Sequence, residues 1–245
     1  MINKIKIYGE RNSGTNFLGE LLKSNLINVS YFHPGHATGK LSDGSGWKHG
    51  KPNFDFFKSI SGTTLFIFLI RDLESWLASM YKCPYHISFG EGENDFLTNK
   101  LQVWNTNDQG HDMYTNPEET NKTIFELRYY KIKSYIEMLS RVENAIFLNL
   151  SSLNKDGGHS FLNKLNSFFG IEKCSEFSPV EEHTKSYRSK NISLPKGCAL
   201  IYKDIDVNFA SEIINSSKDP YIEKFVEDLK QSYFIKSNCC KFLSC

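Results

Sequence analysis

The sequence predicts an α/β fold: a single domain with a mostly parallel central β-sheet flanked by helices. The segment Thr64–Ile70 is apolar on both faces, as a central parallel strand covered by helices on each side should be. Strand patterns alternate with helical patterns along the chain, which favours parallel strands joined by right-handed crossovers. A length of 245 residues with 40% hydrophobic residues suits one such domain and is too short for two comfortable ones.

The N-terminal part of the chain supplies two junctions between a strand and a helix. Lys4–Tyr8 alternates and is rich in Ile, so it reads as the first strand, and Gly14–Asn25 carries apolar residues at helical spacing. Ile27–Phe32 can form another strand, and a long loop over His33–Gly46 follows it. The central apolar strand then leads into a helix over Asp72–Tyr81.

The rest of the chain continues the alternation after a polar stretch. Phe89–Pro117 is Gly- and Asn-rich with scattered aromatic residues, and we interpret it as an insertion that binds an acceptor. We expect residues 1–236 to form the domain and residues 237–245 to be a cysteine-containing tail. The remaining expected elements are a helix at Glu118–Ser140, a strand at Asn144–Leu150, a helix at Ser160–Phe169 and a helix at Pro220–Tyr233.

Composition and charge narrow the class of protein. A formal net charge of +1 does not indicate nucleic-acid binding, because a domain that binds nucleic acid normally has a strong excess of basic residues. No apolar run reaches the roughly 20 residues needed to span a bilayer. The chain enters a strand directly after Met1, so we expect a cytoplasmic protein with no membrane span and no nucleic-acid partner. We expect reduced thiols at Cys83, Cys174, Cys198, Cys239, Cys240 and Cys245.

The segment Gly9–Thr15 has the form of an anion-binding loop. A glycine-containing loop that leads from a strand into a helix presents backbone N–H groups and the positive end of the helix dipole. The usual nucleoside-triphosphate version has lysine after its second glycine and then a hydroxyl that binds Mg²⁺. Those positions are Thr15 and Asn16 here, so an ordinary kinase or ATPase is disfavoured while the phosphate or sulfate site remains.

A second anion site is indicated at the end of the central strand. Arg71 ends this strand and Ser79 follows eight residues later on the next helix. A guanidinium fork and a hydroxyl could hold one phosphate there, although Arg71 could instead pair with Asp72 or Glu74 while Ser79 only packs. Two anion sites at neighbouring strand ends match a nucleotide with phosphates on its 3′ and 5′ sides.

These two motifs resemble those of sulfotransferases that use 3′-phosphoadenosine 5′-phosphosulfate (PAPS). Ser13-Gly14-Thr15-Asn16-Phe17 resembles the family's 5′-phosphosulfate loop, and Ile70–Tyr81 resembles its 3′-phosphate site. The resemblance covers about Ile5–Tyr81, is thin over Asn144–Leu150 and is lost thereafter. It implies a P-loop-like sulfotransferase fold that binds PAPS through Asn12, Ser13, Gly14, Thr15, Asn16, Phe17, Arg71 and Ser79, with Phe17 either stacked on adenine or packed in the core.

The residues that the resemblance implies for the chemistry are Lys48 and His49. Trp47–Pro52 is similar to the family's lysine-histidine strand end, where histidine is the base and lysine contacts the transferred group. An unperturbed histidine pKa near 6.5 suits a base at neutral pH. Neighbouring residues of a regular strand point to opposite faces, so both side chains can face the site only if the strand ends there, which Gly46 and Gly50 permit.

The sequence departs from the family pattern in the first loop. Many relatives place lysine or arginine directly before the small-Gly-Thr triplet, whereas this chain has Asn12, with Arg11 one residue earlier. Either Arg11 or Lys48 could supply the missing cation. Glu10 is a rival base, or could form an ion pair with Arg11. The weak candidates for a later basic loop over the 3′-phosphate are Arg188, Lys190 and Lys196-Gly197.

Taken together, the motifs predict a sulfotransferase that moves a sulfuryl group from PAPS to a hydroxyl acceptor, releases 3′,5′-adenosine bisphosphate (PAP) and needs no metal. His49 is the expected base, with Lys48 and Arg11 as the cations. A carbohydrate is the favoured acceptor, and a lipid, a phenol or a peptide tyrosine would look similar. The alternatives are a P-loop-type nucleotide or small-molecule kinase and a non-catalytic nucleotide- or glycan-binding module of the same fold.

Overall fold

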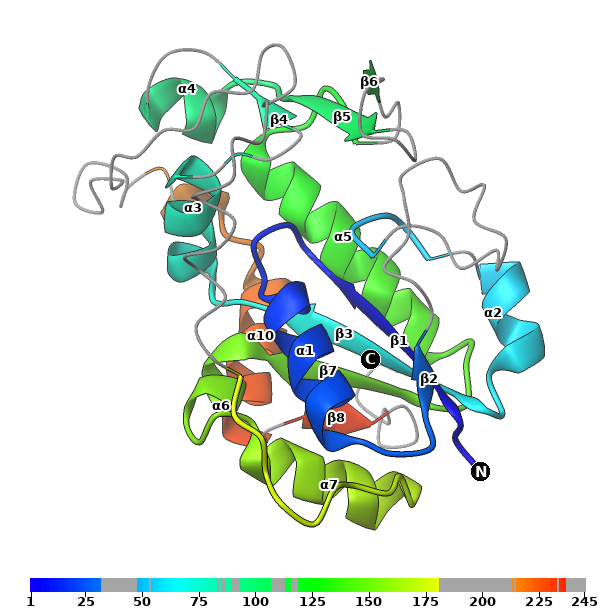
Figure 1. Cartoon of the computed structure of the whole chain (residues 1–245). Helices are drawn as coiled ribbons and strands as arrows, with labels where there is room; N and C mark the ends of the chain where they lie inside the picture. The colour runs from blue at the N-terminus through cyan, green and yellow to red at the C-terminus, as the bar shows by residue number, and fades with distance from the viewer. Residues whose placement is uncertain are drawn as a thin grey trace.

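A five-stranded, mostly parallel sheet forms the centre of the computed structural model (Figure 1). Its strand order is β2-β1-β3-β7-β8, with the first four strands parallel and β8 antiparallel to β7. The strands are β1 (Lys4–Gly9), β2 (Ser30–Tyr31), β3 (Thr64–Ile70), β7 (Ala145–Asn149) and β8 (Phe234–Lys236). The structure describes residues 1–31, 48–52, 54–82, 84, 87–89, 93–106, 113–115, 119–180, 213, 215–232 and 234–236.

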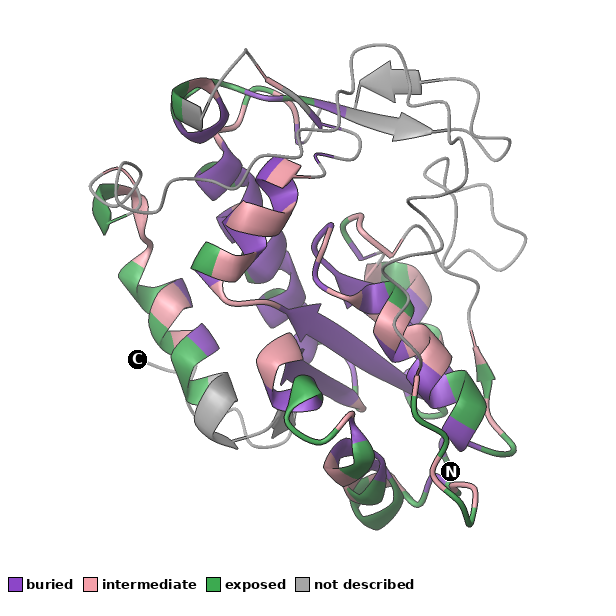
Figure 2. Ribbon diagram, turned by 60° about the vertical axis from the view of Figure 1, so that its left-hand side comes forward, coloured by how far each residue is buried: buried purple, intermediate pink, exposed green. Residues whose placement is uncertain are grey.

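Helices cover both faces of this sheet, which confirms the predicted α/β class. Alternate residues of β3 point to opposite sides, so Leu65, Ile67 and Leu69 meet one apolar cluster while Phe66, Phe68 and Ile70 meet another. All seven residues of β3 are buried, as the purple centre of Figure 2 shows. The helices are α1 (Thr15–Asn25), α2 (Phe54–Ile60), α3 (Leu73–Lys82), α5 (Ile124–Leu139), α6 (Leu150–Asn154), α7 (His159–Phe169) and α10 (Pro220–Ser232).

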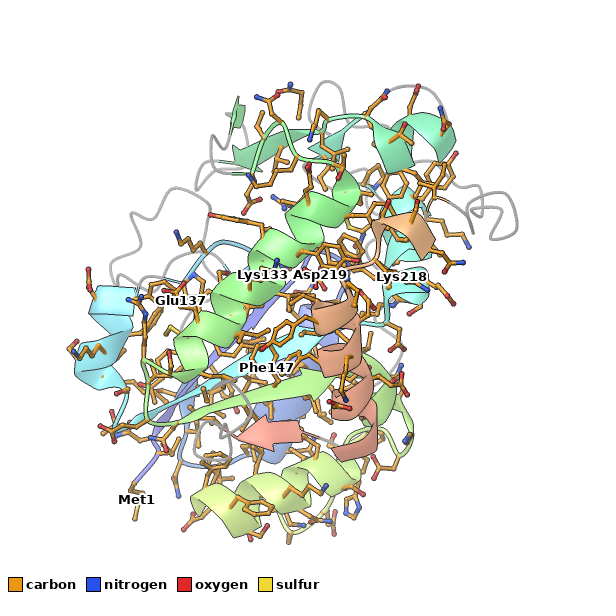
Figure 3. The ribbon with its side chains drawn as sticks, turned by 180° about the vertical axis from the view of Figure 1, so that it is seen from behind. Met1, Lys133, Glu137, Phe147, Lys218 and Asp219 are labelled. Carbon is orange, nitrogen blue, oxygen red and sulfur yellow. The ribbon has the colours of Figure 1, made fainter. Side chains whose placement is uncertain are left out.

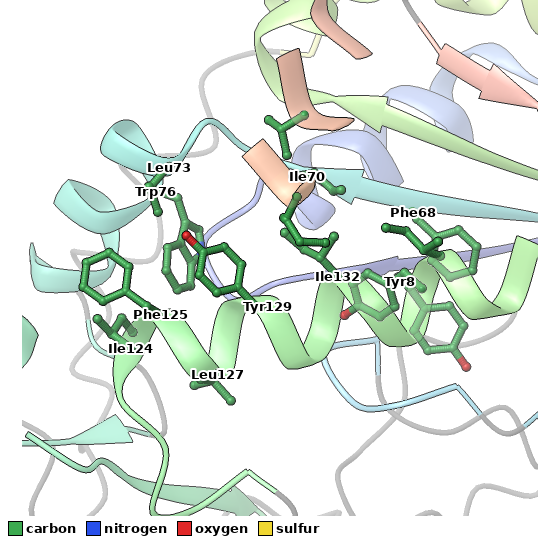
Figure 4. Packing of buried hydrophobic residues seen from close by; sticks show 14 of the residues in the cluster. Tyr8, Phe68, Ile70, Leu73, Trp76, Ile124, Phe125, Leu127, Tyr129 and Ile132 are labelled. Carbon is green, nitrogen blue, oxygen red and sulfur yellow. The ribbon is translucent and has the colours of Figure 1, made fainter. Parts of the chain in front are cut away.

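Aromatic side chains fill the space between the sheet and α5. The Tyr8 and Phe68 rings stack at 5.8 Å between centroids, and Tyr135 of α5 stacks on Phe68 at 5.2 Å. Nearer the start of α5, Trp76 of α3 lies beside Tyr129 in the same cluster (Figure 4). This packing holds the carboxyl ends of β1 and β3 against α5 and α3, and both anion motifs follow those strand ends.

A second, three-stranded antiparallel sheet has two of its strands in the segment Phe89–Pro117, which was expected to be an acceptor-binding insertion, and its first strand just before that segment. It consists of β4 (Ile87–Ser88), β5 (Gln102–Thr106) and β6 (Met113–Thr115), and α4 (Glu93–Thr98) joins the first two strands. The sequence prediction assigned no regular structure to Phe89–Pro117. Its signal was weak because few apolar residues anchor it: Phe96, Leu97, Leu101 and Val103 are buried.

Several element boundaries differ from those predicted, each for a local reason. Of the described residues in the strand expected over Ile27–Phe32, only Ser30 and Tyr31 form β2, because Asn28 adopts a left-handed conformation with φ 59°. The helix expected from Glu118 begins at Ile124, where Thr123 and Glu126 form a capping box. Leu150, expected to end a strand, starts α6 because the Asn149 side chain caps that helix. Helices α2 and α6 and strand β8 were not predicted.

The predicted tail and most cysteines lie outside the described residues. Only Cys174 is described, and its thiol is free. Across the described ranges, no helix combines the length and the apolar character that crossing a membrane requires.

We expect Gly14→Ala to destabilise the fold because α1 starts from a left-handed residue. Gly14 has φ 90° and ψ 18°, and an added Cβ would lie 2.7 Å from Leu150 Cδ1. The left-handed conformation alone should cost about 1–2 kcal/mol. Gly19→Ala, in the same helix, should instead stabilise by about 0.5–1 kcal/mol, because its added Cβ would make only an ordinary van der Waals contact with Ile7 Cδ1 at 3.9 Å. Urea unfolding of both variants tests this, and equal midpoints would contradict it.

Candidate functional site

The loop between β1 and α1 is a tight turn with its polar groups bonded inward. The Ser13 backbone N–H and its hydroxyl both donate to the Glu10 carbonyl, at 3.2 and 2.7 Å. Asn12 adopts a left-handed conformation with φ 60°. A Cβ on Gly9 would meet Ser13 Oγ at 2.5 Å and Leu69 O at 2.8 Å, so only glycine fits there. Ser13, predicted to bind the cofactor, therefore uses both of its donors within the loop.

The start of α1 presents backbone donors and a neighbouring cation. The first N–H groups of an α-helix have no partner within the helix and carry its positive dipole end. The N-cap residue Gly14 has no side chain to accept them, and the first turn holds no acidic residue. The Lys48 ammonium donates a hydrogen bond to the Asn16 side-chain oxygen at this helix start. Burial, and then Lys23, lower the pKa of Lys48 to about 8.

Asn12 joins this loop to the second predicted anion site. Its carbonyl accepts a hydrogen bond from Arg71 Nη1 at 3.2 Å, and its amide Nδ2 donates to the Ser79 carbonyl at 3.2 Å. Arg71 and Ser79 are both half-buried, on β3's carboxyl end and on α3. Burial lowers the pKa of Arg71, and the neighbouring Asp72 acts in the opposite direction. The structure thus brings Arg71 and Ser79 beside the helix start.

His49 is bonded to the last residue of β1. Its Nδ1 lies 2.8 Å from the Gly9 carbonyl, which can only accept, so Nδ1 carries the proton and Nε2 of the neutral ring carries the lone pair. The Gly9 N–H donates in turn to the Lys48 carbonyl at 3.0 Å. Residues Lys48–Gly50 form a turn rather than a strand, so both side chains contact the β1–α1 region.

The electrostatics around His49 favour its neutral form. Burial lowers the pKa of His49 well below its usual range, and the nearby cations Lys48, Arg11 and Lys131 add to the shift. The hydrogen bond to Gly9 acts in the opposite direction without outweighing them. His49 is therefore neutral at physiological pH, as a proton acceptor needs to be.

Glu10 and Arg11 occupy buried positions beneath the loop rather than its ligand side. Arg11 is 3% exposed, and its Nη1 lies 3.2 Å from Glu119 Oε2. Glu10 is 1% exposed, and its Oε2 lies 2.7 Å from Arg128 Nη1. The Glu10–Arg11 ion pair considered from the sequence is therefore wrong, because each residue pairs with a partner near or on α5. This burial removes Glu10 from reach of an acceptor and Arg11 from reach of a loop-bound anion.

Two charged residues of α5 complete the buried network, and sequence reasoning missed both. Arg128 is fully buried and donates to the Arg71 carbonyl at 2.8 Å as well as to Glu10. Lys131 is 2% exposed, pairs with Glu119 at 2.6 Å and donates to the His49 carbonyl. A signal was present: Arg128 stands between Ile124 and Ile132 on the apolar stripe of the predicted helix, where a charge needs an internal partner.

The two buried carboxylates respond differently to their surroundings. Burial raises the pKa of Glu10 to about 7, outweighing the opposing effects of Arg128 and Lys131. Burial also acts to raise the pKa of Glu119, but the charges of Lys131 and Arg11 outweigh it and the pKa is lowered. Glu119, with two cations against it, is therefore the firmly ionised member of the network.

The remaining predicted residues divide between the core and undescribed segments. Thr15 is buried at the first position of α1, and Phe17 is half-buried against the apolar cluster that α1 shares with the sheet. Phe17 thus packs as a core residue. The predicted residues that lie outside the described ranges are Trp47, Arg188, Lys190 and Lys196-Gly197.

Neither a metal cluster nor a known relative identifies the site. Within the described part of the chain, no group of three or more His, Cys, Asp or Glu side chains is arranged to hold a metal ion. Comparisons with known protein families, with curated proteins and with solved structures give no significant match for this chain. The geometry of the β1–α1 loop and its neighbours is therefore the feature of this chain that bears on its function.

We expect the depressed pKa of His49 to make the protein less stable in acid. Below about pH 6.5 the unfolded chain binds a proton at this histidine that the folded chain refuses, so the free energy of unfolding falls as pH falls, by at most about 1.4 kcal/mol per pH unit. Urea unfolding between about pH 5 and 7 measures the slope. His49→Gln should flatten it, while His159→Gln, at an exposed position of α7, should keep it. Identical slopes in both variants would contradict the assignment.

Proposed function

We propose that this chain is a sulfotransferase with a P-loop-like sulfotransferase fold, which transfers a sulfuryl group from PAPS to a hydroxyl acceptor and releases PAP. The observation that carries the proposal is the double contact of Asn12, which sets Arg71 and Ser79 beside the start of α1. Two anion positions that adjoin in this way suit one nucleotide with separate 3′ and 5′ phosphates. His49 stands at the same strand end, on Gly9.

The start of α1 fits the 5′ end of the nucleotide. Its first backbone N–H groups, at Gly14, Thr15 and Asn16, are the donors that the loop leaves for an anion, since Ser13 is bonded inward. Lys48 replaces the loop cation that the sequence lacks at Asn12, because its ammonium is held at Asn16. Arg11 does not take that part, as it is buried with Glu119.

The 3′-phosphate fits the opposite side of Asn12. There the half-buried Arg71 offers a guanidinium fork, and Ser79 offers a hydroxyl from α3. The Arg71 carbonyl is fixed by Arg128 at 2.8 Å, so its backbone is held from behind while its side chain reaches the loop. A fixed guanidinium loses less conformational freedom when it binds an anion.

His49 is the base in this proposal. PAPS, when bound, supplies the sulfuryl group. The acceptor hydroxyl must lose a proton as it becomes bonded to sulfur, and Nε2 of neutral His49 can take it while Nδ1 stays bonded to Gly9. Lys48 precedes His49 in the sequence, and its positive charge can stabilise the negative charge that builds on the leaving PAP. We place a carbohydrate hydroxyl as the acceptor on the strength of the polar, aromatic-bearing segment Phe89–Pro117.

We expect PAP to raise the melting temperature of the protein more than ATP with Mg²⁺ does. A ligand at 100 times its Kd stabilises a fold by about 2.7 kcal/mol. Differential scanning fluorimetry with matched concentrations of PAP, ATP and AMP measures the order. No shift with PAP would falsify the cofactor assignment, and a larger shift with ATP and Mg²⁺ would favour a kinase. A shift with PAP but no sulfated product from any hydroxyl acceptor would favour a non-catalytic binding module.

We expect Arg71→Met and His49→Gln to separate binding from transfer. Arg71→Met removes a charge-assisted contact worth about 1.5–3 kcal/mol, so the Kd for PAP should rise about 10- to 100-fold. His49→Gln should leave that Kd nearly unchanged and slow the transfer about 10²- to 10⁴-fold. Isothermal titration and single-turnover assays measure the two effects. Arg141→Met, at a position with a 48% exposed side chain, is the matched control. Wild-type transfer by His49→Gln would exclude this base.

A further inference from the structure

Three charged side chains form a buried triad directly beneath His49. Glu119 accepts from Arg11 Nη1 at 3.2 Å through one oxygen and from Lys131 Nζ at 2.6 Å through the other. None of the three side chains is more than 3% exposed. With two cations and one carboxylate, this Arg11–Glu119–Lys131 triad has a net charge of +1 in a region closed to solvent.

Lys131 has a further contact that leaves the triad and reaches the proposed base. Its ammonium donates to the backbone carbonyl of His49 as well as to Glu119. His49 is consequently held at two points, by its carbonyl on Lys131 and by its ring Nδ1 on the Gly9 carbonyl at 2.8 Å. Because both its backbone and its ring are fixed, His49 holds its Nε2 atom in one direction.

A buried lysine at this position needs an explanation beyond packing. Burial lowers the pKa of Lys131 to about 8, which shows that the charged form is disfavoured by the site even with Glu119 beside it. An apolar side chain of similar length would avoid that penalty, since buried ion pairs add little net stability compared with apolar residues of the same volume. What an apolar side chain could not do is donate a hydrogen bond to the His49 carbonyl.

Glu119 connects the triad to the small antiparallel sheet. The residue after it, Thr120, bonds through its hydroxyl to the backbone of Val103 in β5, at 3.2 Å to the N–H and 3.3 Å to the carbonyl. The Asn121 N–H also donates to the Leu101 carbonyl, at 3.0 Å. The segment Phe89–Pro117, which we expect to bind the acceptor, is thus bonded to Thr120 and Asn121, the two residues that follow Glu119.

We propose that Lys131 is a positioning residue for His49 and that Glu119 holds Lys131 in place. The consequence for catalysis rests on the proposed function, in which His49 takes the acceptor proton. Lys131 fixes the backbone of the base through the His49 carbonyl. Burial is the main cause of the lowered pKa of the His49 ring, and the charges of Lys48, Arg11 and Lys131 add to it. The triad also links His49 to the antiparallel sheet β4-β5-β6, through Lys131, Glu119 and the neighbouring Thr120. The proposed base and the segment expected to bind the acceptor therefore keep a fixed relative position.

Lys131→Met tests this role, with Lys133→Met as the matched control. Lys133 lies two residues along the same helix with a 60% exposed side chain and pairs with Asp219 on the surface (Figure 3). NMR of the imidazole nitrogens in the ¹⁵N-labelled protein reports the tautomer and the pKa of His49 without any ligand. Lys131→Met should mix the tautomers and raise the pKa of His49. In single turnover it should slow transfer about 10- to 100-fold with little change in the Kd for PAP.

A second variant keeps the test decisive if the single one does not fold. Glu119→Gln with Lys131→Met leaves Arg11 as the only charge of the triad, so the net charge stays +1, and it also lacks the donor to His49. It should show the same loss of His49 order. A folded single or double variant with wild-type tautomer and pKa would overturn the proposal. Absence of transfer in the wild-type protein would overturn the proposed function alone, because the NMR result stands independently of it.

Discussion

The buried pair between Glu10 and Arg128 is the contact on which the arrangement of the site depends. Glu10 begins the loop after β1, and its carboxylate lies 2.7 Å from Arg128 at the middle of α5. The same guanidinium donates to the Arg71 carbonyl at 2.8 Å and lies 5.0 Å from the Trp76 ring centre. Its Nε is 3.8 Å from Glu223 of α10. One side chain therefore fixes the ends of β1 and β3 and the helices beside them.

The network is better explained by geometry than by stability. Burying charges is expensive, and removing one member of a buried pair typically costs about 3–5 kcal/mol because the other is left uncompensated. Glu10 and Glu119 both lie beneath the loop, each matched by a cation, so no carboxylate of this network faces the start of α1. An apolar interior could hold the loop, but it could not satisfy the Arg71 and His49 carbonyls.

The sequence predicts the sheet better than it predicts the site, for a physical reason. β3 was predicted with its observed bounds because Thr64 is followed by six apolar residues, a run of the length expected for a buried strand. The β1–α1 loop follows from local residues, since a glycine, a small residue and a helix start determine it, whereas Lys48 and His49 were expected at a strand end and lie in a turn. Arg128, Lys131 and Glu119 could not be placed in this way, because their partners are distant in sequence and only the folded chain brings them together. β8 was missed for a similar reason: its partner β7 is remote in sequence.

The contacts of Asn12 bear on the proposed anion site, because this loop has asparagine at the position where the family pattern has a cation. Its left-handed backbone, with φ 60°, is tolerated by asparagine far better than by long or branched side chains. Its side-chain amide donates to the Ser79 carbonyl, a bond that a lysine side chain would not reproduce in the same geometry, while its backbone carbonyl accepts from Arg71. The positive charge comes instead from Lys48 at the start of α1 and from Arg71 across Asn12. Cations in two places favour a ligand with its charge in two places, and a triphosphate concentrates its charge at one end. In the proposed function, asparagine at position 12 is thus compatible with a nucleotide that has separate 3′ and 5′ phosphates.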